Sequence, residues 1–340
     1  IYLAAAILFL DTNVVIPFLK LRLDRKAKIF SLFRIINISV NIILNVYLII
    51  VLGWGIEAIL ISNLAASAVS LILVSFTILK NFRPKFHSLL FKRMFKFGIP
   101  FLPAGFAIML IQVIDVPILE KLTDLQTVGI YKANYKLGIF MMLFVNMFQF
   151  AWQPFFLQNA KEPNAKEMFS KVLTYFTLVG SVILIVLSLF ITDIAQIKIS
   201  GFSLIGPEYW AGLHIVPFIL LAYLINGMHT IFSAGIYIEE KSIYVPVITG
   251  IGAMINVAAN FLLIPVLSLT GAAIAALVSY LFIGFGYYYV AQKFFNVKYE
   301  LKRIGHIFIA VFLVGVVFYY LDSTDNLLFH YKVLLLILFS

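Results

Sequence analysis

Residues 97–136 read FGIPFLPAGFAIMLIQVIDVPILEKLTDLQTVGIYKANYK. The stretch begins with an apolar run that contains three prolines and a single acid, Asp115. A short polar turn follows, and a second apolar run begins near Gly129 and carries Lys132 and Lys136 one helical turn apart. Apolar runs of this length cross a bilayer as helices, because about 20 helical residues span a hydrocarbon core about 30 Å thick. The stretch therefore predicts two membrane spans joined by a short turn.

The composition of the whole chain also indicates an integral membrane protein. Of the 340 residues, 63% are apolar and 12% are charged, which leaves too few polar side chains to cover a soluble domain of this size. Cysteine is absent, so disulfide frameworks and thiolate metal sites are excluded. The sequence holds no metal-ligand cluster, catalytic triad or phosphate-cradling glycine loop. We therefore expect no resident metal, no cofactor and no enzymatic activity.

Eleven apolar runs are separated by charged or turn residues, and most are long enough to span a bilayer. They cover approximately residues 1–19, 30–51, 56–79, 97–120, 129–158, 169–192, 210–238, 242–264, 270–292, 304–321 and 327–340. We predict an all-α polytopic membrane protein with about 11 transmembrane helices. Because the chain opens with Ile1 inside one apolar run and ends inside another, we expect it to be an internal fragment of a longer protein.

Lysine and arginine concentrate in alternate loops. Most of the 25 basic residues lie in or beside the loops at 20–28, 80–96, 161–171, 241 and 293–303. The intervening loops contain only Lys121 and Lys198. By the positive-inside rule, the basic loops face the cytoplasm. This placement also accounts for most of the net charge of +10, so we expect no nucleic-acid partner.

An internal repeat is visible at an offset of 215 residues. The matching positions are Asp24 with Glu239, Lys26 with Lys241, Asn41 with Asn256, and Asn45 with Asn260. The offset covers six spans, an even number, so both copies share one orientation in the membrane. This predicts two lobes related by an axis along the membrane normal, as in parallel-repeat transporters.

Few ionisable groups lie inside the predicted spans, which makes each of them a candidate functional group. Asp115 and Lys136 fall at matching depth, so either they form an ion pair that fastens two helices, or they line a charged cavity together with Lys132. Arg34 lies about one and a half turns inside its span, where a guanidinium suits phosphate oxygens or lipid head groups. Asp11 is expected at mid-span and buried, either as a proton or cation site or as a neutral, hydrogen-bonded acid.

Two sets of neutral side chains are also candidates. The paired asparagines predict hydrogen bonds between helices, and Asn41 and Asn256 are additional candidates for a polar cavity. The aromatic set either stacks on sugars or forms belts at the membrane interface, and we favour belts. It comprises Tyr131, Tyr135, Trp152 and Tyr287 to Tyr289.

Two segments identify a family resemblance: FGIPFLPAGFAIMLIQVIDVPIL at 97–119 and VGIYKANYKLGIFMMLFVNMFQFAWQPFFLQNA at 128–160. They resemble the polysaccharide transporter family, the O-antigen and capsule repeat-unit flippases of the multidrug/oligosaccharidyl-lipid/polysaccharide superfamily. The span pattern and the repeat extend the resemblance over nearly the whole chain. That family has about fourteen helices in two six-helix lobes plus two more, so the eleven runs correspond to spans four to fourteen.

The resemblance implies four regions. They are the end of the first lobe at 1–80, a basic cytoplasmic linker at 81–96, the second six-helix lobe at 97–292, and two additional helices at 293–340, the last of them truncated.

The resemblance also implies a function: transport of a polyprenyl-diphosphate-linked oligosaccharide across the cytoplasmic membrane by alternating access. The implied partners are that lipid-linked oligosaccharide, membrane lipids, and other polysaccharide-assembly proteins such as a polymerase. Basic residues line the cavity in the family, and Arg34, Lys132 and Lys136 are the candidates for that role here. Asp115, Asn41 and Asn256 complete the candidate cavity.

Three alternatives remain open from the sequence. A multidrug or cation antiporter of the same superfamily would use Asp11 and Asp115 for ion coupling. A membrane polysaccharide polymerase or ligase usually carries a long outer loop with catalytic arginine or histidine, whereas the longest outer loop here, 192–210, holds one lysine. The third alternative is a lipid-bound scaffold without transport activity.

Overall fold

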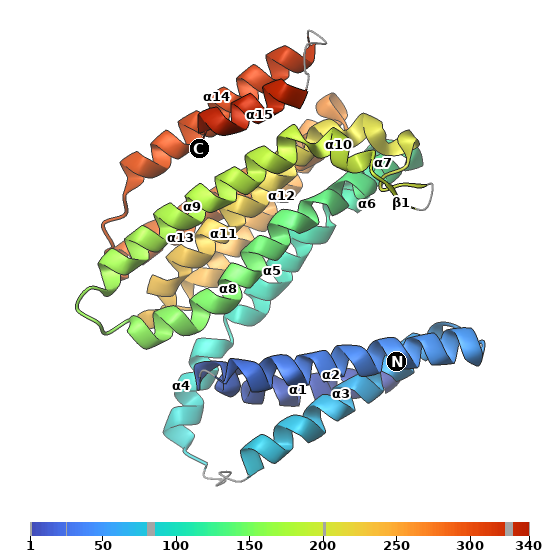
Figure 1. The fold of residues 1–340 in the computed structure, drawn as a ribbon. Coiled ribbons are helices and arrows are strands. Elements are labelled where there is room, and N and C mark those ends of the chain that lie inside the picture. The colour runs from blue at the N-terminus through green and yellow to red at the C-terminus, as the bar shows by residue number, and fades with distance from the viewer. Residues whose placement is uncertain (1, 25, 80–85, 200–201, 324–328, 340) are drawn as a thin grey trace. The chain divides into compact units, whose positions relative to one another are not determined.

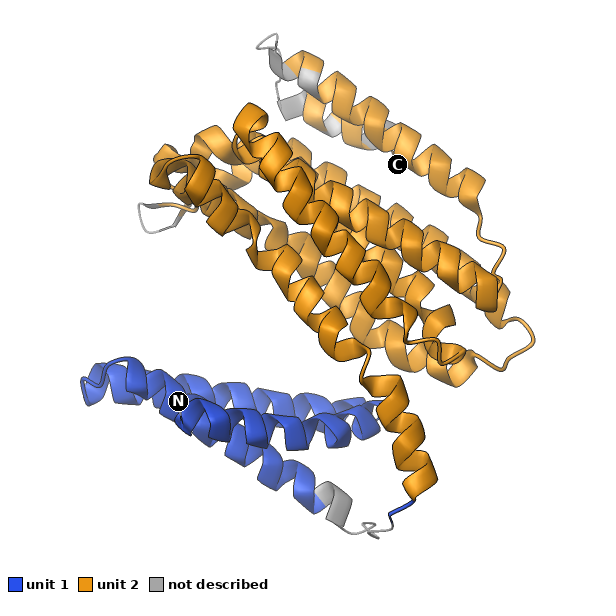
Figure 2. Ribbon diagram, turned by 180° about the vertical axis from the view of Figure 1, so that it is seen from behind, with its two compact units in different colours: residues 1–87 blue, residues 88–340 orange. Residues whose placement is uncertain are grey.

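The computed structural model of the chain describes residues 2–24, 26–79, 86–199, 202–323 and 329–339. These residues are helical nearly throughout, which confirms the all-α prediction, apart from the two-residue strands β1 (Lys198–Ile199) and β2 (Phe202–Ser203). The chain divides into two compact units, unit 1 at residues 1–87 and unit 2 at residues 88–340 (Figure 2). The division falls inside the predicted linker 81–96.

Unit 1 is a bundle of three long helices. They are α1 (Tyr2–Leu23), α2 (Ala27–Val46), which continues as a short π-helix (Tyr47–Val51), and α3 (Ile56–Leu79). Helix α3 packs against both α1 and α2. Its buried positions include Ala58, Ser62 and Ala66, small residues that let helices in a membrane approach closely.

Unit 2 contains the remaining elements (Figure 1). Its first half comprises α4 (Ser88–Gly98), α5 (Phe101–Val113), α6 (Asp115–Leu122), α7 (Leu125–Tyr135), a 3₁₀ turn at Lys136–Gly138, α8 (Ile139–Asn159), α9 (Ala165–Leu189) and α10 (Ile191–Ala195). Its second half comprises the β1–β2 hairpin, a 3₁₀ segment (Pro207–Ile215), α11 (Val216–Ile238), α12 (Tyr244–Leu267), α13 (Leu269–Phe294), α14 (Leu301–Ser323) and α15 (Phe329–Phe339).

Helix α11 lies at the centre of unit 2. It packs against α13, α8 and α9, while α12 packs against α13 and α5. Most residues of α11 are buried, whereas the other spanning helices expose many large apolar side chains. Figure 1 shows α14 and α15 beside α9, the helix that both of them contact. Unit 2 therefore has one apolar core and an outer surface suited to lipid.

Proline and a capping acid set the boundaries inside residues 97–136. Pro117 lacks the N–H that would bond to the carbonyl of Val113, and the predicted single run is divided there into α5 and α6. Asp115 is the first residue of α6. Asp124 caps α7, because its carboxylate accepts hydrogen bonds from the backbone N–H and the hydroxyl of Thr127, both at 2.9 Å. These bonds to the charged form lower the pKa of Asp124.

Ten helices in the described ranges are long and apolar enough to cross a membrane. They account for ten of the eleven predicted spans. The eleventh run, 327–340, contains α15, which covers 11 described residues. Part of the predicted cytoplasmic linker is also helical, since α4 covers Ser88–Gly98. The chain is a multi-pass membrane protein.

Candidate functional site

The predicted repeat corresponds to two helix triplets with the same local contacts. The first triplet is α1–α2–α3 in unit 1, and the second is α11–α12–α13 in unit 2. In each triplet the third helix packs against the other two. In each, one backbone bond of 2.9 Å closes the turn between the first two helices, from Lys26 N–H to the Leu21 carbonyl and from Lys241 N–H to the Ile236 carbonyl.

The paired asparagines also have the same geometry in both triplets. Asn45 donates its amide N–H to the backbone oxygen and Oδ1 of Asn41, and Asn260 donates in the same way to Asn256. The first pair reaches the neighbouring helix through a 2.8 Å bond from Asn41 to Asn63. Together with the bond from Asn260 to Asp115, this confirms hydrogen bonds between helices for Asn41 and Asn260, whereas the bonds of Asn45 and Asn256 lie within their own helices. Asn41 is partly exposed, whereas Asn256 has no exposed surface. The predicted contact of Asn256 with a substrate therefore stays a prediction.

The second triplet adds an acid to this arrangement. Asp115, at the start of α6, is only 3% exposed. One of its carboxylate oxygens accepts a 2.8 Å bond from Asn260 Nδ2, and the other accepts a 3.0 Å bond from the Tyr131 hydroxyl. Three spans therefore meet at Asp115 through neutral partners.

The predicted ion pair between Asp115 and Lys136 is wrong. The oxygens of Asp115 are held by Asn260 and Tyr131, and no salt bridge of Asp115 occurs among the described residues. Successive residues of a helix are rotated by about 100°, so Tyr131 faces Asp115 while its neighbour Lys132 points elsewhere. Both Lys132 and Lys136 are exposed on unit 2. Because both side chains are exposed, neither takes part in the buried contact between Tyr131 and Asp115.

Two further candidates, Arg34 and Asp11, belong to unit 1. Arg34 is exposed, and its guanidinium carbon lies 4.5 Å from the ring centroid of Phe18, within cation–π range. Asp11 is at mid-span as predicted, but its predicted burial is wrong, because the side chain is exposed. Val14 and Phe18 form a small apolar core with Val74. Asp11 lies on the same side of α1, one turn before Val14 and outside that core.

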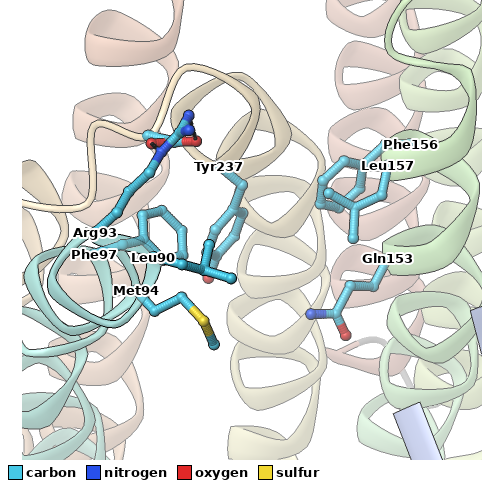
Figure 3. A pocket seen from close by; sticks show the side chains of 9 residues that line it. Leu90, Arg93, Met94, Phe97, Gln153, Phe156, Leu157 and Tyr237 are labelled. Atoms are coloured by element: carbon cyan, nitrogen blue, oxygen red, sulfur yellow. Dashed lines mark hydrogen bonds and ion pairs between the residues drawn. The ribbon is translucent and has the colours of Figure 1, made fainter. Parts of the chain in front are cut away.

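A cavity of about 470 Å³ lies in unit 2 between α4, α8 and the end of α11. Figure 3 shows Gln153 and Phe156 of α8 on one side and Leu90 and Met94 of α4 on the other, with Tyr237 between them. The wall is mainly apolar, and its charged groups are Arg93 and Glu240.

Arg93 and Glu240 form a two-bond ion pair at the edge of this cavity. Arg93 Nη2 lies 2.6 Å from Glu240 Oε1, and Nε lies 3.0 Å from Oε2. The hydrogen bonds from Arg93 lower the pKa of Glu240. Glu240 has a φ of 52°, a left-handed conformation that favours glycine at the end of a helix. The pair joins α4 to the turn between α11 and α12.

A second cavity of about 190 Å³ shares three lining residues, Gln153, Phe156 and Tyr237, with the first. Its other polar wall groups are Gln149 and Trp152 of α8, His229, Thr230 and Ser233 of α11, and Tyr287 of α13. Phe101, Ala104, Gly105, Ile108 and Val245 complete the wall. The two cavities are therefore contiguous parts of unit 2.

The aromatic side chains only partly follow the predicted interface belts. Tyr131 is 1% exposed, and Trp152 and Tyr287 are 3% exposed, so the belt prediction is wrong for these three. Trp152 and Tyr287 line the smaller cavity. Tyr289, by contrast, is 66% exposed, as a belt residue would be.

The sequence reading did not identify Tyr131 and Asn260 as partners of Asp115. The sequence places Tyr131 in the aromatic set and predicts a bond from Asn260 to another helix, without a named partner. The distance from the end of the span would have indicated these partners. Tyr131 and Asn260 each lie about as many residues from that end of their span as Asp115 does from the end of its own. A search for polar residues at one depth across adjacent spans would have grouped all three.

The fold defines a polytopic α-helical membrane protein with polar groups buried between its spans. Residues 1–160, from α1 to the end of α8, match a family model described as "Polysaccharide biosynthesis protein". Over these residues the match agrees with the resemblance to the polysaccharide transporter family. No curated protein and no solved structure matches the chain.

Proposed function

We propose that the protein is a flippase for polyprenyl-diphosphate-linked oligosaccharide repeat units in the cytoplasmic membrane. The observation that carries this proposal is the match of residues 1–160 to the polysaccharide biosynthesis family. A diphosphate and several sugars do not cross hydrocarbon unaided, because burying an uncompensated ion costs on the order of tens of kcal/mol. A polar pathway through the protein would replace water around the head group while the prenyl chain stays in lipid.

Arg34, Lys132 and Lys136 are the proposed contacts of the diphosphate. Each is exposed in its unit, and none has a carboxylate within ion-pair distance among the described residues. A cation without a carboxylate partner is available to a phosphate oxygen. Asn41, which is partly exposed in unit 1, is a further, neutral candidate.

The test compares Arg34→Ala, Lys132→Ala and Lys136→Ala with Lys161→Ala, a matched control that removes an exposed lysine outside the spans. Surface polysaccharide is measured in cells that depend on the protein, together with its abundance in the membrane. We expect a several-fold fall in polysaccharide for the three site variants at unchanged abundance, and no change for the control. Normal polysaccharide in all three variants would contradict the assignment of these bases.

A cation-coupled antiporter is the second candidate function, and Asp115 is the observation that favours it. An acid buried against neutral partners is able to exchange a proton or another cation, because no basic side chain neutralises it. Asp11 is a second candidate for ion coupling, now on an exposed face of α1. The same chemistry would also serve a flippase driven by an ion gradient. Asp115→Asn is therefore expected to remove the ion dependence of transport in either case.

A further inference from the structure

The smaller cavity of unit 2 has a wall without formal charge. No carboxylate, ammonium or guanidinium group lines it, in contrast to the larger cavity with its Arg93–Glu240 pair. The polar groups of the wall are amides, hydroxyls, an indole and an imidazole. A ligand that enters it therefore has to be recognised by neutral hydrogen bonds.

Two buried polar atoms in this wall have no hydrogen-bond partner within the described residues, the indole Nε1 of Trp152 and the imidazole Nδ1 of His229. Trp152 is 3% exposed, and its Nε1 makes no hydrogen bond within the described residues. Leaving a buried N–H unpaired costs about 1–3 kcal/mol, so such groups usually meet a water or a ligand. The amides of Gln149 and Gln153, one helical turn apart on the same helix, are exposed and line the same cavity.

Helix α11 supplies hydrogen-bond acceptors to the same wall. The Thr230 hydroxyl donates to the backbone oxygen of Asn226 at 3.3 Å, and the Ser233 hydroxyl donates to the backbone oxygen of Thr230 at 2.7 Å. Because their hydrogens are committed to the helix backbone, these two oxygens are left as acceptors. Thr230 and Ser233 are both buried and both line the cavity.

This combination selects one chemical class. A phosphate, which only accepts hydrogen bonds from protein groups, would face the acceptor oxygens of Thr230 and Ser233. A cation would face the indole N–H of Trp152. A sugar hydroxyl both donates and accepts, so it satisfies the two sides together. The volume of about 190 Å³ equals roughly six water molecules at about 30 Å³ each, which is room for a single ring.

We propose that the cavity bounded by Trp152, Gln149, Gln153, Thr230 and Ser233 binds one uncharged sugar ring of the transported head group. The inference rests on the proposed flippase function and adds the position and chemistry of sugar recognition. The larger cavity, which shares Gln153, Phe156 and Tyr237 with it, provides the adjoining space.

Trp152 also serves as the reporter in the test. The chain has three tryptophans, so replacing Trp54 and Trp210 by phenylalanine leaves Trp152 as the only one. The purified protein in detergent is titrated with free neutral hexoses, N-acetylhexosamines and 6-deoxyhexoses. Hexuronates test the exclusion of charge, and glycerol at equal concentration controls for solvent effects. Flipping by the same preparation is measured in proteoliposomes with a fluorescent lipid-linked oligosaccharide.

We expect a saturable change in Trp152 emission with at least one neutral sugar and none with hexuronates or glycerol. Ser233→Ala and Thr230→Val should each weaken the affinity about fivefold, the equivalent of one hydrogen bond. Ser181→Ala is the matched control, because it removes a buried hydroxyl from α9 outside the cavity. Its affinity should equal that of the parent protein.

Three results would overturn the inference. Flipping without any sugar-dependent change at Trp152 would mean that the cavity holds water only, and the flippase function would stand. Equal affinities in the parent, Ser233→Ala and Thr230→Val proteins would place the sugar elsewhere. If neither flipping nor sugar binding occurred, both this inference and the proposed function would fail.

Discussion

The two helix triplets share a backbone design but differ in what their asparagines hold. In the first triplet, Asn41 and Asn45 are partly exposed, and their chain of bonds ends at the amide oxygen of Asn63. In the second triplet, Asn256 and Asn260 are fully buried, and their chain of bonds ends at the carboxylate of Asp115. One motif therefore supports a neutral helix contact in unit 1 and an acidic centre in unit 2.

The difference shows how a repeat acquires a site. The intra-helical bond between paired asparagines fixes the orientation of the second amide in both copies. Only in unit 2 does another span, α6, bring an acid to that amide. The local motif is thus a scaffold, and the neighbouring helix decides its chemistry.

The largest effect is expected from Asn260→Leu. The change removes a hydrogen bond to a buried acid and leaves Tyr131 as the remaining partner of Asp115, which costs about 2–3 kcal/mol. Asn45→Leu removes the matching amide in unit 1, where no acid is involved, and should cost about 0.5–1 kcal/mol. Thermal unfolding in detergent measures both variants.

The double variant Asp115→Leu/Asn260→Leu sharpens this comparison. Replacing both partners of a buried hydrogen bond by apolar groups is nearly neutral, so the double variant should be more stable than Asn260→Leu alone. Additive losses would show that Asp115 and Asn260 are not coupled. Equal losses for Asn260→Leu and Asn45→Leu would remove the distinction between the triplets.

A smaller effect is expected where α12 and α13 approach each other at Gly252. A Cβ there would lie 2.5 Å from Cγ1 of the buried Ile283, so Gly252→Ala should cost about 1–2 kcal/mol. Gly250 is the matched control, because a Cβ there meets nothing within 4 Å, and Gly250→Ala should stabilise the helix by up to about 1 kcal/mol. Chemical denaturation would reveal the opposite signs, and equal signs would contradict the close approach.

The equivalent of Gly252 in the first triplet is Asn37. Its amide bonds to the Ala66 carbonyl at 2.8 Å and to the Ser70 hydroxyl at 2.9 Å. In unit 1 the side chain of Asn37 on α2 donates to α3, whereas in unit 2 the hydroxyl of Ser279 on α13 donates to the Gly252 carbonyl of α12 at 2.8 Å. The two triplets therefore differ in which helix supplies the side chain of this bond, as well as in charge.

The smallest effect is expected at the turn that opens α12, where the exposed Arg93–Glu240 pair adds a contact. Arg93 lowers the pKa of Glu240 below its ordinary value of 4.5. The stabilisation is therefore fully present above that ordinary value and is lost as the pH falls through the lowered folded-state pKa. We expect the wild-type protein to be slightly more stable than Glu240→Gln at neutral pH. In acid, the stabilities of the two proteins should become equal. A difference that persisted in acid would exclude the pair as its cause.

Two substitutions at Glu240 separate the effect of the ion pair on stability from the effect of the backbone conformation. Glu240→Ala and Glu240→Gly both lose the pair, but only glycine adopts the φ of 52° without strain. The glycine variant should therefore have the higher melting temperature of the two. Melting temperatures in the reverse order would contradict the left-handed conformation at this turn.

Helix positions and depths were readable from the sequence, whereas rotation about each helix axis was not. The apolar runs located ten spanning helices, and the paired asparagines predicted bonds that the structure contains. Depth alone paired Asp115 with Lys136, but about 100° of rotation per residue gives Tyr131 that contact. For the same reason the burial of Trp152 was missed and that of Asp11 was wrongly expected. Which face meets a neighbour depends on packing between distant segments.

The central claim is that the protein moves a lipid-linked saccharide. The most direct measurement uses proteoliposomes that contain the purified chain, with a fluorescent polyprenyl-diphosphate oligosaccharide and the organic cation ethidium as competing cargoes. The account predicts faster transbilayer movement of the saccharide lipid than in protein-free vesicles, and no uptake of ethidium. Uptake of ethidium without movement of the saccharide lipid would contradict the account and identify a cation exporter.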